Sequence, residues 1–298
     1  MNFKNIILSL ALTTGACTNT SSLVHQSSIQ TRVNGIELSP DGSSAQIGMN
    51  GASCEVNTNG GYFILDSDVI PGSEEWIQDS SLEQTLVIGE DRSQTFVLDG
   101  KDFNPIQVIQ TPNVEWARFT DAGIVTLENS RSGCNINFIS EDGELEESKS
   151  ISCQAISLDS SISNVFLTDG ENISIISIDE TTSFKLPTED ISIYNSREII
   201  YAVNNSTITA ISSFGEVLWE KDLGSEIQDL DTVQSSGEPI LMLGDENSGE
   251  IIILNPLDGE PTQSFQTPGI GKEIKVSDSG EVIAVIQEEW IHFLKIVR

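Results

Sequence analysis

Histidine is scarce in this chain, and this limits the catalytic chemistry that the sequence can support. Only two histidines occur among 298 residues, beside 46 acidic residues. A serine–histidine–aspartate triad requires a histidine as its base, but His25 lies in a polar N-terminal stretch and His292 alternates with apolar neighbours. No G-x-S-x-G motif occurs either. We therefore assign no catalytic residue and expect His292 to be structural.

Carboxylates are the other source of chemistry. A glycosidase needs only two Asp or Glu side chains held a few ångströms apart, but with so many acidic residues no particular pair stands out. The segment 244–250, GDENSGE, offers oxygen ligands for Ca²⁺. It lacks the alternating D-x-D-x-D-G spacing of known calcium loops, so we interpret it as a solvated turn. The sequence therefore indicates no metal site and no cofactor.

Three cysteines follow Cys17 in the chain. The residues between Cys134 and Cys153 predict a hairpin that turns at Asp142 and Gly143. Antiparallel pairing about the bond between Gly143 and Glu144 would place the two cysteines opposite each other. They would then form either a cross-strand disulfide or two buried thiols. Three cysteines without a nearby histidine do not make a zinc site, and we expect Cys54 to be buried.

Residues 1–17 have the order of an export signal. Lys4 precedes an apolar run over residues 6–12, and small residues lead into Cys17. The apolar run is far shorter than the roughly 20 residues that a membrane-spanning helix needs. An export signal is therefore the better interpretation.

The end of this signal resembles the lipobox of bacterial lipoproteins, in which the cysteine is lipidated and becomes the new N-terminus. Gly15, Ala16 and Cys17 fit that pattern, whereas Thr14 stands where the family usually has an aliphatic residue. The resemblance implies a lipid anchor at Cys17, and Thr18 after it implies the outer membrane. An ordinary secretory signal cleaved near Ala16, giving a secreted or periplasmic protein, is the alternative. Residues 18–32 are then expected to be a polar tether and a ring-closing strand.

The chain is strongly acidic, with a formal net charge of −32. Such a charge repels phosphate backbones and anionic lipid head groups, so we expect no nucleic-acid partner and membrane contact only through a lipid anchor. The acidic residues are scattered along the sequence. They indicate either a solvated surface that keeps an exported protein soluble, or a surface that meets a basic partner or divalent cations.

An internal repeat sets the fold class. Short alternating segments, each running into a polar turn, start at Ile36, Trp76, Trp116, Ile156, Ile191, Ile227 and Ile274. Successive starts are 40, 40, 40, 35, 36 and 47 residues apart, and a four-stranded propeller blade takes about 40–45 residues. A second and often a third apolar strand follow each start, and no helical periodicity competes with them. We therefore predict an all-β, closed β-propeller of about seven four-stranded blades over residues 33–298, with six or eight blades as alternatives.

The last repeat supplies only three strands, so another segment must complete the ring. We expect a strand at about residues 27–33 to do so, because closure covers edges that would otherwise template aggregation.

Two segments resemble named repeats. Residues 207–224, TITAISSFGEVLWEKDLG, are similar to the PQQ-like repeat, with Trp219 as the matching tryptophan. Residues 251–269 follow the same outline with Phe265 in its place, and the other repeats are nearer to a WD40-like outline. The resemblance implies that Trp219 packs between neighbouring blades, and we expect the same of Trp76 and Trp116.

Within the PQQ-like group, the chain is similar in plan to the propeller lipoprotein of the outer-membrane β-barrel assembly machinery. It departs from that protein in having about seven blades rather than eight, so the partners of that protein are not carried over.

Two functions fit these features. One is a non-catalytic, membrane-anchored scaffold of the cell envelope, whose partner is another envelope protein. The other is a hydrolase or lyase with a carboxylate-based site in the central funnel. Buried, clustered carboxylates around the channel would favour the enzyme, and an exposed apolar patch would favour the scaffold.

Overall fold

A computed structural model describes most of the chain and shows an all-β molecule. The described residues are 22–30, 35–39, 41–49, 52–57, 61–64, 76–80, 84–88, 92–99, 105–120, 123–130, 133–151, 157–160, 164–194, 197–245, 248–267, 271–287 and 290–297. Within these ranges, no helix has the length and apolarity of a membrane span.

The described strands form seven four-stranded antiparallel sheets, the blades of a propeller. Blade 1 consists of β2 (Gly35–Leu38), β3 (Ser44–Met49), β4 (Ala52–Asn57) and β5 (Gly61–Ile64). Blade 2 consists of β6 (Trp76–Ser80), β7 (Gln84–Ile88), β8 (Gln94–Asp99) and β9 (Pro105–Gln110). Blade 3 consists of β10 (Val114–Thr120), β11 (Gly123–Ser130), β12 (Gly133–Ile139) and β13 (Leu145–Ile151). Blade 4 consists of β14 (Ser157–Ser160), β15 (Val165–Thr168), β16 (Asn172–Ile176) and β17 (Thr181–Lys185). Blade 5 consists of β18 (Asp190–Tyr194), β19 (Ile199–Asn204), β20 (Thr207–Ser212) and β21 (Val217–Asp222). Blade 6 consists of β22 (Ile227–Thr232), β23 (Pro239–Asp245), β24 (Ser248–Leu254) and β25 (Pro261–Gln266). Blade 7 consists of β26 (Glu273–Val276), β27 (Val282–Ile286), β28 (Trp290–Val297) and β1 (Ser22–Gln30).

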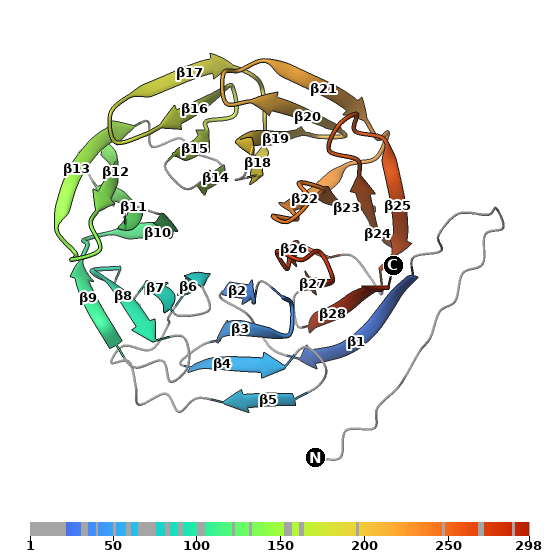
Figure 1. The fold of residues 1–298 in the computed structure, drawn as a ribbon, viewed down its shortest axis with the longest axis horizontal. Coiled ribbons are helices and arrows are strands. Elements are labelled where there is room, and N and C mark those ends of the chain that lie inside the picture. Colours follow the sequence, from blue (N-terminus) through green and yellow to red (C-terminus); the bar gives the residue numbers. More distant parts are fainter. Residues whose placement is uncertain are drawn as a thin grey trace.

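The blades are arranged in a ring around a central axis, with the first strand of each blade innermost (Figure 1). Each predicted repeat start lies in or directly beside one of these first strands, from β2 to β26. The predicted propeller of about seven blades is therefore confirmed.

An N-terminal strand completes blade 7. β1 pairs antiparallel with β28, from Ser22 opposite Val297 to Gln30 opposite Trp290. This strand begins at Ser22, so its position differs from the expected stretch at residues 27–33. The sequence SLVHQSSIQ is mostly polar. A fourth strand lies on the outside of the ring, where polar side chains are tolerated. A strand at this position is therefore hard to predict from the pattern of apolar residues.

Apolar side chains between adjacent blades form the core. The second strands are largely buried, and β15 and β27 are buried at every position, whereas the fourth strands are largely exposed, as in β17 and β25. Each cluster of buried residues joins two neighbouring blades; the largest, between blades 5 and 6, includes Tyr201, Trp219 and Leu241. Isoleucine, valine and leucine predominate because β-branched and aliphatic side chains fit a pleated surface that is covered on both faces.

Candidate functional site

Two aspartates on β22, the innermost strand of blade 6 (Figure 1), link that blade to blade 7. The Asp229 carboxylate accepts the Ile274 backbone N–H at 2.6 Å, and the Asp231 carboxylate accepts the Val276 backbone N–H at 2.7 Å. The donors lie on β26, the first strand of the next blade. These side chains therefore satisfy backbone donors at the edge of β26 that would otherwise need another partner.

The local structure of β22 places both carboxylates on one side. A bulge between Ile227 and Asp229 resets the register, after which alternation puts Asp229 and Asp231 on one face. Leu230, between them, packs into the apolar cluster of blades 5 and 6. On the other side, the buried hydroxyls of Ser192 in β18 and Thr232 in β22 lie 2.8 Å apart in a hydrogen bond. Polar side chains thus join three consecutive blades near the central axis.

The surroundings of these aspartates disfavour their charged forms. Burial raises the pKa of Asp229 well above its usual value, the Asp190 carboxylate raises it further, and the Ile274 N–H opposes the change. Burial also raises the pKa of Asp231, against the nearby charges of Lys275 and Arg118. Arg118 belongs to β10 in blade 3. Charged groups from blades 3, 5, 6 and 7 therefore influence one region of the ring.

His292 does not join these carboxylates in a triad. His292 lies on β28, the third strand of blade 7, where its Nε2 is 3.2 Å from Gln287 Oε1 and its ring stacks on Trp290 at 6.2 Å. His25 lies on β1, opposite Leu294. Among the described residues, no group of three or more His, Cys, Asp or Glu side chains is arranged to hold a metal ion. Within the segment 244–250, Asp245 at the end of β23 pairs with Ser248 at the start of β24.

The predicted cysteine register is wrong by two residues. Cys134 lies opposite Ile151 rather than Cys153, because the hairpin turns about Asp142, where the Ser140 N–H donates to the Glu144 carbonyl, and not about the bond between Gly143 and Glu144. Cys134 is nevertheless disulfide-bonded. Cys153, the partner that we predicted, lies outside the described residues, as does the predicted lipidation site Cys17.

The three tryptophans expected to pack between blades have different surroundings. Trp76 begins β6, and its side chain lies outside the described part of the structure. Trp116 packs against a cluster shared by blades 3 and 4. Trp219, on β21 of blade 5, is 9% exposed; its Nε1 donates to the Pro256 carbonyl of blade 6 at 2.9 Å.

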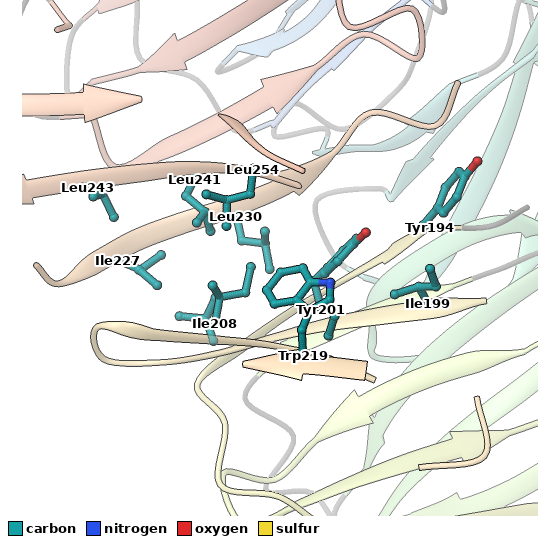
Figure 2. Packing of buried hydrophobic residues seen from close by; sticks show 12 residues of the cluster. Tyr194, Ile199, Tyr201, Ile208, Trp219, Ile227, Leu230, Leu241, Leu243 and Leu254 are labelled. Carbon is teal, nitrogen blue, oxygen red and sulfur yellow. The ribbon is translucent and has the colours of Figure 1, made fainter. Parts of the chain in front are cut away.

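Trp219 also fixes the turn that follows Pro256. Its ring lies 5.8 Å from the Tyr201 ring, facing the leucines of blade 6 (Figure 2). A Cβ atom at Gly259 would come within 2.6 Å of the Trp219 ring, and Gly259 has a φ of +69°. Only glycine combines that backbone conformation with so close an approach.

A recurring turn marks the outer edge of blades 3 to 6, between the third and fourth strands. In each, a backbone N–H at the start of the turn donates to the carbonyl of a glutamate just before the fourth strand; the pairs are Ser140 and Glu144, Ser177 and Glu180, Ser212 and Glu216, Asn255 and Glu260. We call these four segments, residues 140–145, 177–180, 212–217 and 255–260, the rim turns. All four glutamates are exposed.

Large apolar side chains are exposed on the same turns. Phe214 is 91% exposed, Leu257 73%, Leu145 62%, Val217 58% and Ile178 39%. Each rim turn therefore presents at least one apolar side chain beside a carboxylate.

Comparisons with known proteins show the fold. No protein-family model matches the chain, and no curated protein matches it. It is similar to a chain in the crystal structure of the mitotic checkpoint complex, with 10% identity and a TM-score of 0.68 over 100% of this chain and 99% of that one. It is also similar to the RRP9 WD40 repeats, with 9% identity and a TM-score of 0.71 over 92% and 97% of the two chains.

A third similar structure is the Cps50 (Swd1) β-propeller domain of Myceliophteria thermophila, with 9% identity, a TM-score of 0.69 and 92% and 99% coverage. The chain has the fold of a WD40-like β-propeller. Identities this low show the fold alone.

Sequence reasoning missed both the linking aspartates and the rim turns. Asp229 and Asp231 stand in the recognised repeat start IQDLDT, but the backbone donors that they meet come from the next blade. The rim glutamates had a signal of their own, since they recur at intervals of 36, 36 and 44 residues ahead of alternating strands.

Proposed function

We propose that this protein is a non-catalytic interaction scaffold, exported and anchored by a lipid on Cys17, most simply in the outer membrane. The export signal and lipobox-like end of residues 1–17 support export and anchoring. The disulfide-bonded Cys134 supports an oxidising compartment. The similarity of residues 207–224 to the PQQ-like repeat fits a bacterial envelope propeller.

One observation carries the scaffold proposal: large apolar side chains are exposed on a strongly acidic protein. Phe214 and Leu257 are 91% and 73% exposed and lie on equivalent turns of adjacent blades. Single exposed apolar residues are ordinary on protein surfaces, but each of the four rim turns carries at least one, and a gathering of exposed apolar side chains at one end of the ring is typical of a binding surface.

The alternative hydrolase or lyase would draw on Asp229 and Asp231. Each of these carboxylates accepts a backbone N–H of blade 7, so their environment is accounted for by their role in joining blades. Buried ion-pair and hydrogen-bond networks shift pKa values without catalysis. The scaffold is therefore the better supported function.

Membrane fractionation and affinity capture test the proposal together. Wild-type protein should sediment with membranes and incorporate labelled fatty acid, whereas the Cys17→Ser variant should do neither. Capture from native membranes should recover a specific envelope protein with the wild type. An unlipidated wild type would overturn the anchor, and recovery of no protein above background would overturn the scaffold.

A further inference from the structure

The rim turns and the amino end of β1 lie at the same end of the ring. In blades 3 to 6 the third strand runs toward its rim turn, and in blade 7 the third strand is β28, which ends at Val297. Ser22, the first residue of β1, pairs with Val297. The chain therefore enters the propeller at the position that a rim turn would occupy in blade 7.

The distance from the predicted anchor to this end of the ring is short. Five residue steps separate Cys17 from Ser22, and a fully extended chain of that length spans at most about 18 Å. A lipid on Cys17 would therefore hold the rim-turn end close to the membrane and leave the opposite end farther away.

The charge of the rim turns selects their partner. Their side chains include no lysine or arginine, and their carboxylates come from Glu141, Asp142, Glu144, Asp179, Glu180, Glu216, Asp258 and Glu260. The Lys221 ammonium of β21 forms an ion pair with the Glu260 carboxylate at 2.8 Å, so one of these carboxylates already binds a basic side chain. Anionic lipid head groups would be repelled by such a surface, whereas a basic protein segment would be attracted.

The exposed apolar side chains indicate that the partner also has apolar side chains. Phe214 and Val217 of blade 5 and Leu257 of blade 6 lie next to the rim glutamates, and their exposure leaves apolar area for a partner to bury. The successive outer strands β13, β17, β21 and β25 follow one another along the circumference (Figure 1). The rim turns thus form an arc, and each turn in it carries both acidic and apolar side chains.

We propose that this arc docks a basic, amphipathic segment of a membrane-associated protein. The proposal rests on the scaffold function proposed above and specifies its surface, its orientation and the chemistry of its partner. The basic side chains of the segment pair with the rim glutamates, and its apolar side chains cover Phe214 and Leu257.

A defined peptide tests the surface independently of the anchor. The probe is a fluorescent amphipathic peptide made only of leucine and lysine, titrated with the full-length protein in detergent and followed by anisotropy. The Glu180→Lys/Glu216→Lys variant should bind it about tenfold more weakly than the wild type. The matched control is Glu171→Lys/Glu226→Lys, which changes the net charge equally at exposed positions on the opposite end of the ring. This control should bind within about twofold of the wild type.

A second pair of variants tests the apolar part of the arc. Phe214→Ser/Leu257→Ser should also weaken peptide binding about tenfold, whereas Trp290→Ser, at the opposite end, should not. Unchanged thermal unfolding checks that each variant is folded. Equal weakening by the rim and control charge pairs would overturn the proposal, because the peptide would then report net charge alone.

Lipid binding is the competing outcome. The Cys17→Ser protein is mixed with vesicles of phosphatidylcholine and phosphatidylglycerol and sedimented. Binding that disappears with Phe214→Ser/Leu257→Ser would overturn the proposal in favour of a lipid-contacting face; absence of binding supports it. Failure of the anchor appears only in membrane fractionation, and failure of the arc only in the peptide titration or the vesicle sedimentation, so the two are distinguishable.

Discussion

Acidic side chains near the central axis and on the rim turns have the same chemical group in opposite surroundings. Asp229 and Asp231 are desolvated and accept backbone N–H groups from the next blade. Glu180 and Glu216 are exposed, and it is their backbone carbonyls that close the turns. The first pair connects parts of the fold, whereas the second pair leaves its carboxylates facing solvent.

This difference teaches what an acidic composition does in a propeller. A buried carboxylate is costly unless it is hydrogen-bonded, so it is placed where the adjacent first strand offers an unpaired donor. An exposed carboxylate costs little and contributes to the field that a partner meets. The same comparison predicts which substitutions change stability and which change binding.

The largest effect is expected at Trp219, in the core between blades 5 and 6. This residue lies on the strand that follows a rim turn, yet it is buried between blades and donates to the Pro256 carbonyl. Trp219→Ala should lower the free energy of unfolding by about 3–5 kcal/mol, measured by urea denaturation. Leu218→Ala, at the adjacent half-exposed position, should cost far less. Equal losses would show that the outer strand does not contribute to the junction between blades.

A smaller loss is expected at the linking aspartates. Asp231→Ala leaves the Val276 N–H without its acceptor, which should cost about 1–3 kcal/mol. Asp231→Asn keeps an acceptor oxygen and should remain close to the wild type. On the rim, Glu216→Ala should stay within about 0.5 kcal/mol. Coinciding denaturation curves for Asp231→Ala and Glu216→Ala would show that the buried aspartate contributes no more to stability than the exposed glutamate.

The sequence predicts the frame of the molecule because the blades repeat. Alternation and spacing locate the first strands at Ile36, Ile191 and Ile274 within a residue or two of their true positions. Each blade meets the same local demands, since its inner strands are covered on both faces. Seven repeats of one pattern therefore define the propeller without reference to any single residue.

Contacts between blades and local bulges are not visible in that pattern. Cys134 pairs two residues away from the expected position because the hairpin turns about Asp142, slightly earlier than its sequence indicates. The strand at Ser22 is polar, so it has the composition of a tether until β28 pairs with it. Likewise, nothing near Asp229 in the sequence reveals the Ile274 N–H, which lies 45 residues away.

The dependence of stability on pH provides the finest test of the comparison. In the folded state the pKa values of Asp229 and Asp231 are raised above their usual value of 3.8. The folded protein therefore binds protons more tightly than the unfolded chain, and stability falls as pH rises through the folded-state pKa values. Lowering the pH from 7 to 5 should increase the unfolding free energy of the wild type more than that of Asp229→Asn/Asp231→Asn. Urea denaturation of both proteins at each pH measures this difference, and Glu180→Gln/Glu216→Gln provides the rim control. Because the amide variants keep the hydrogen-bond acceptors, a difference between the pH profiles would isolate the cost of the buried charges, whereas parallel profiles would mean that the two aspartates are solvated much as the rim glutamates are.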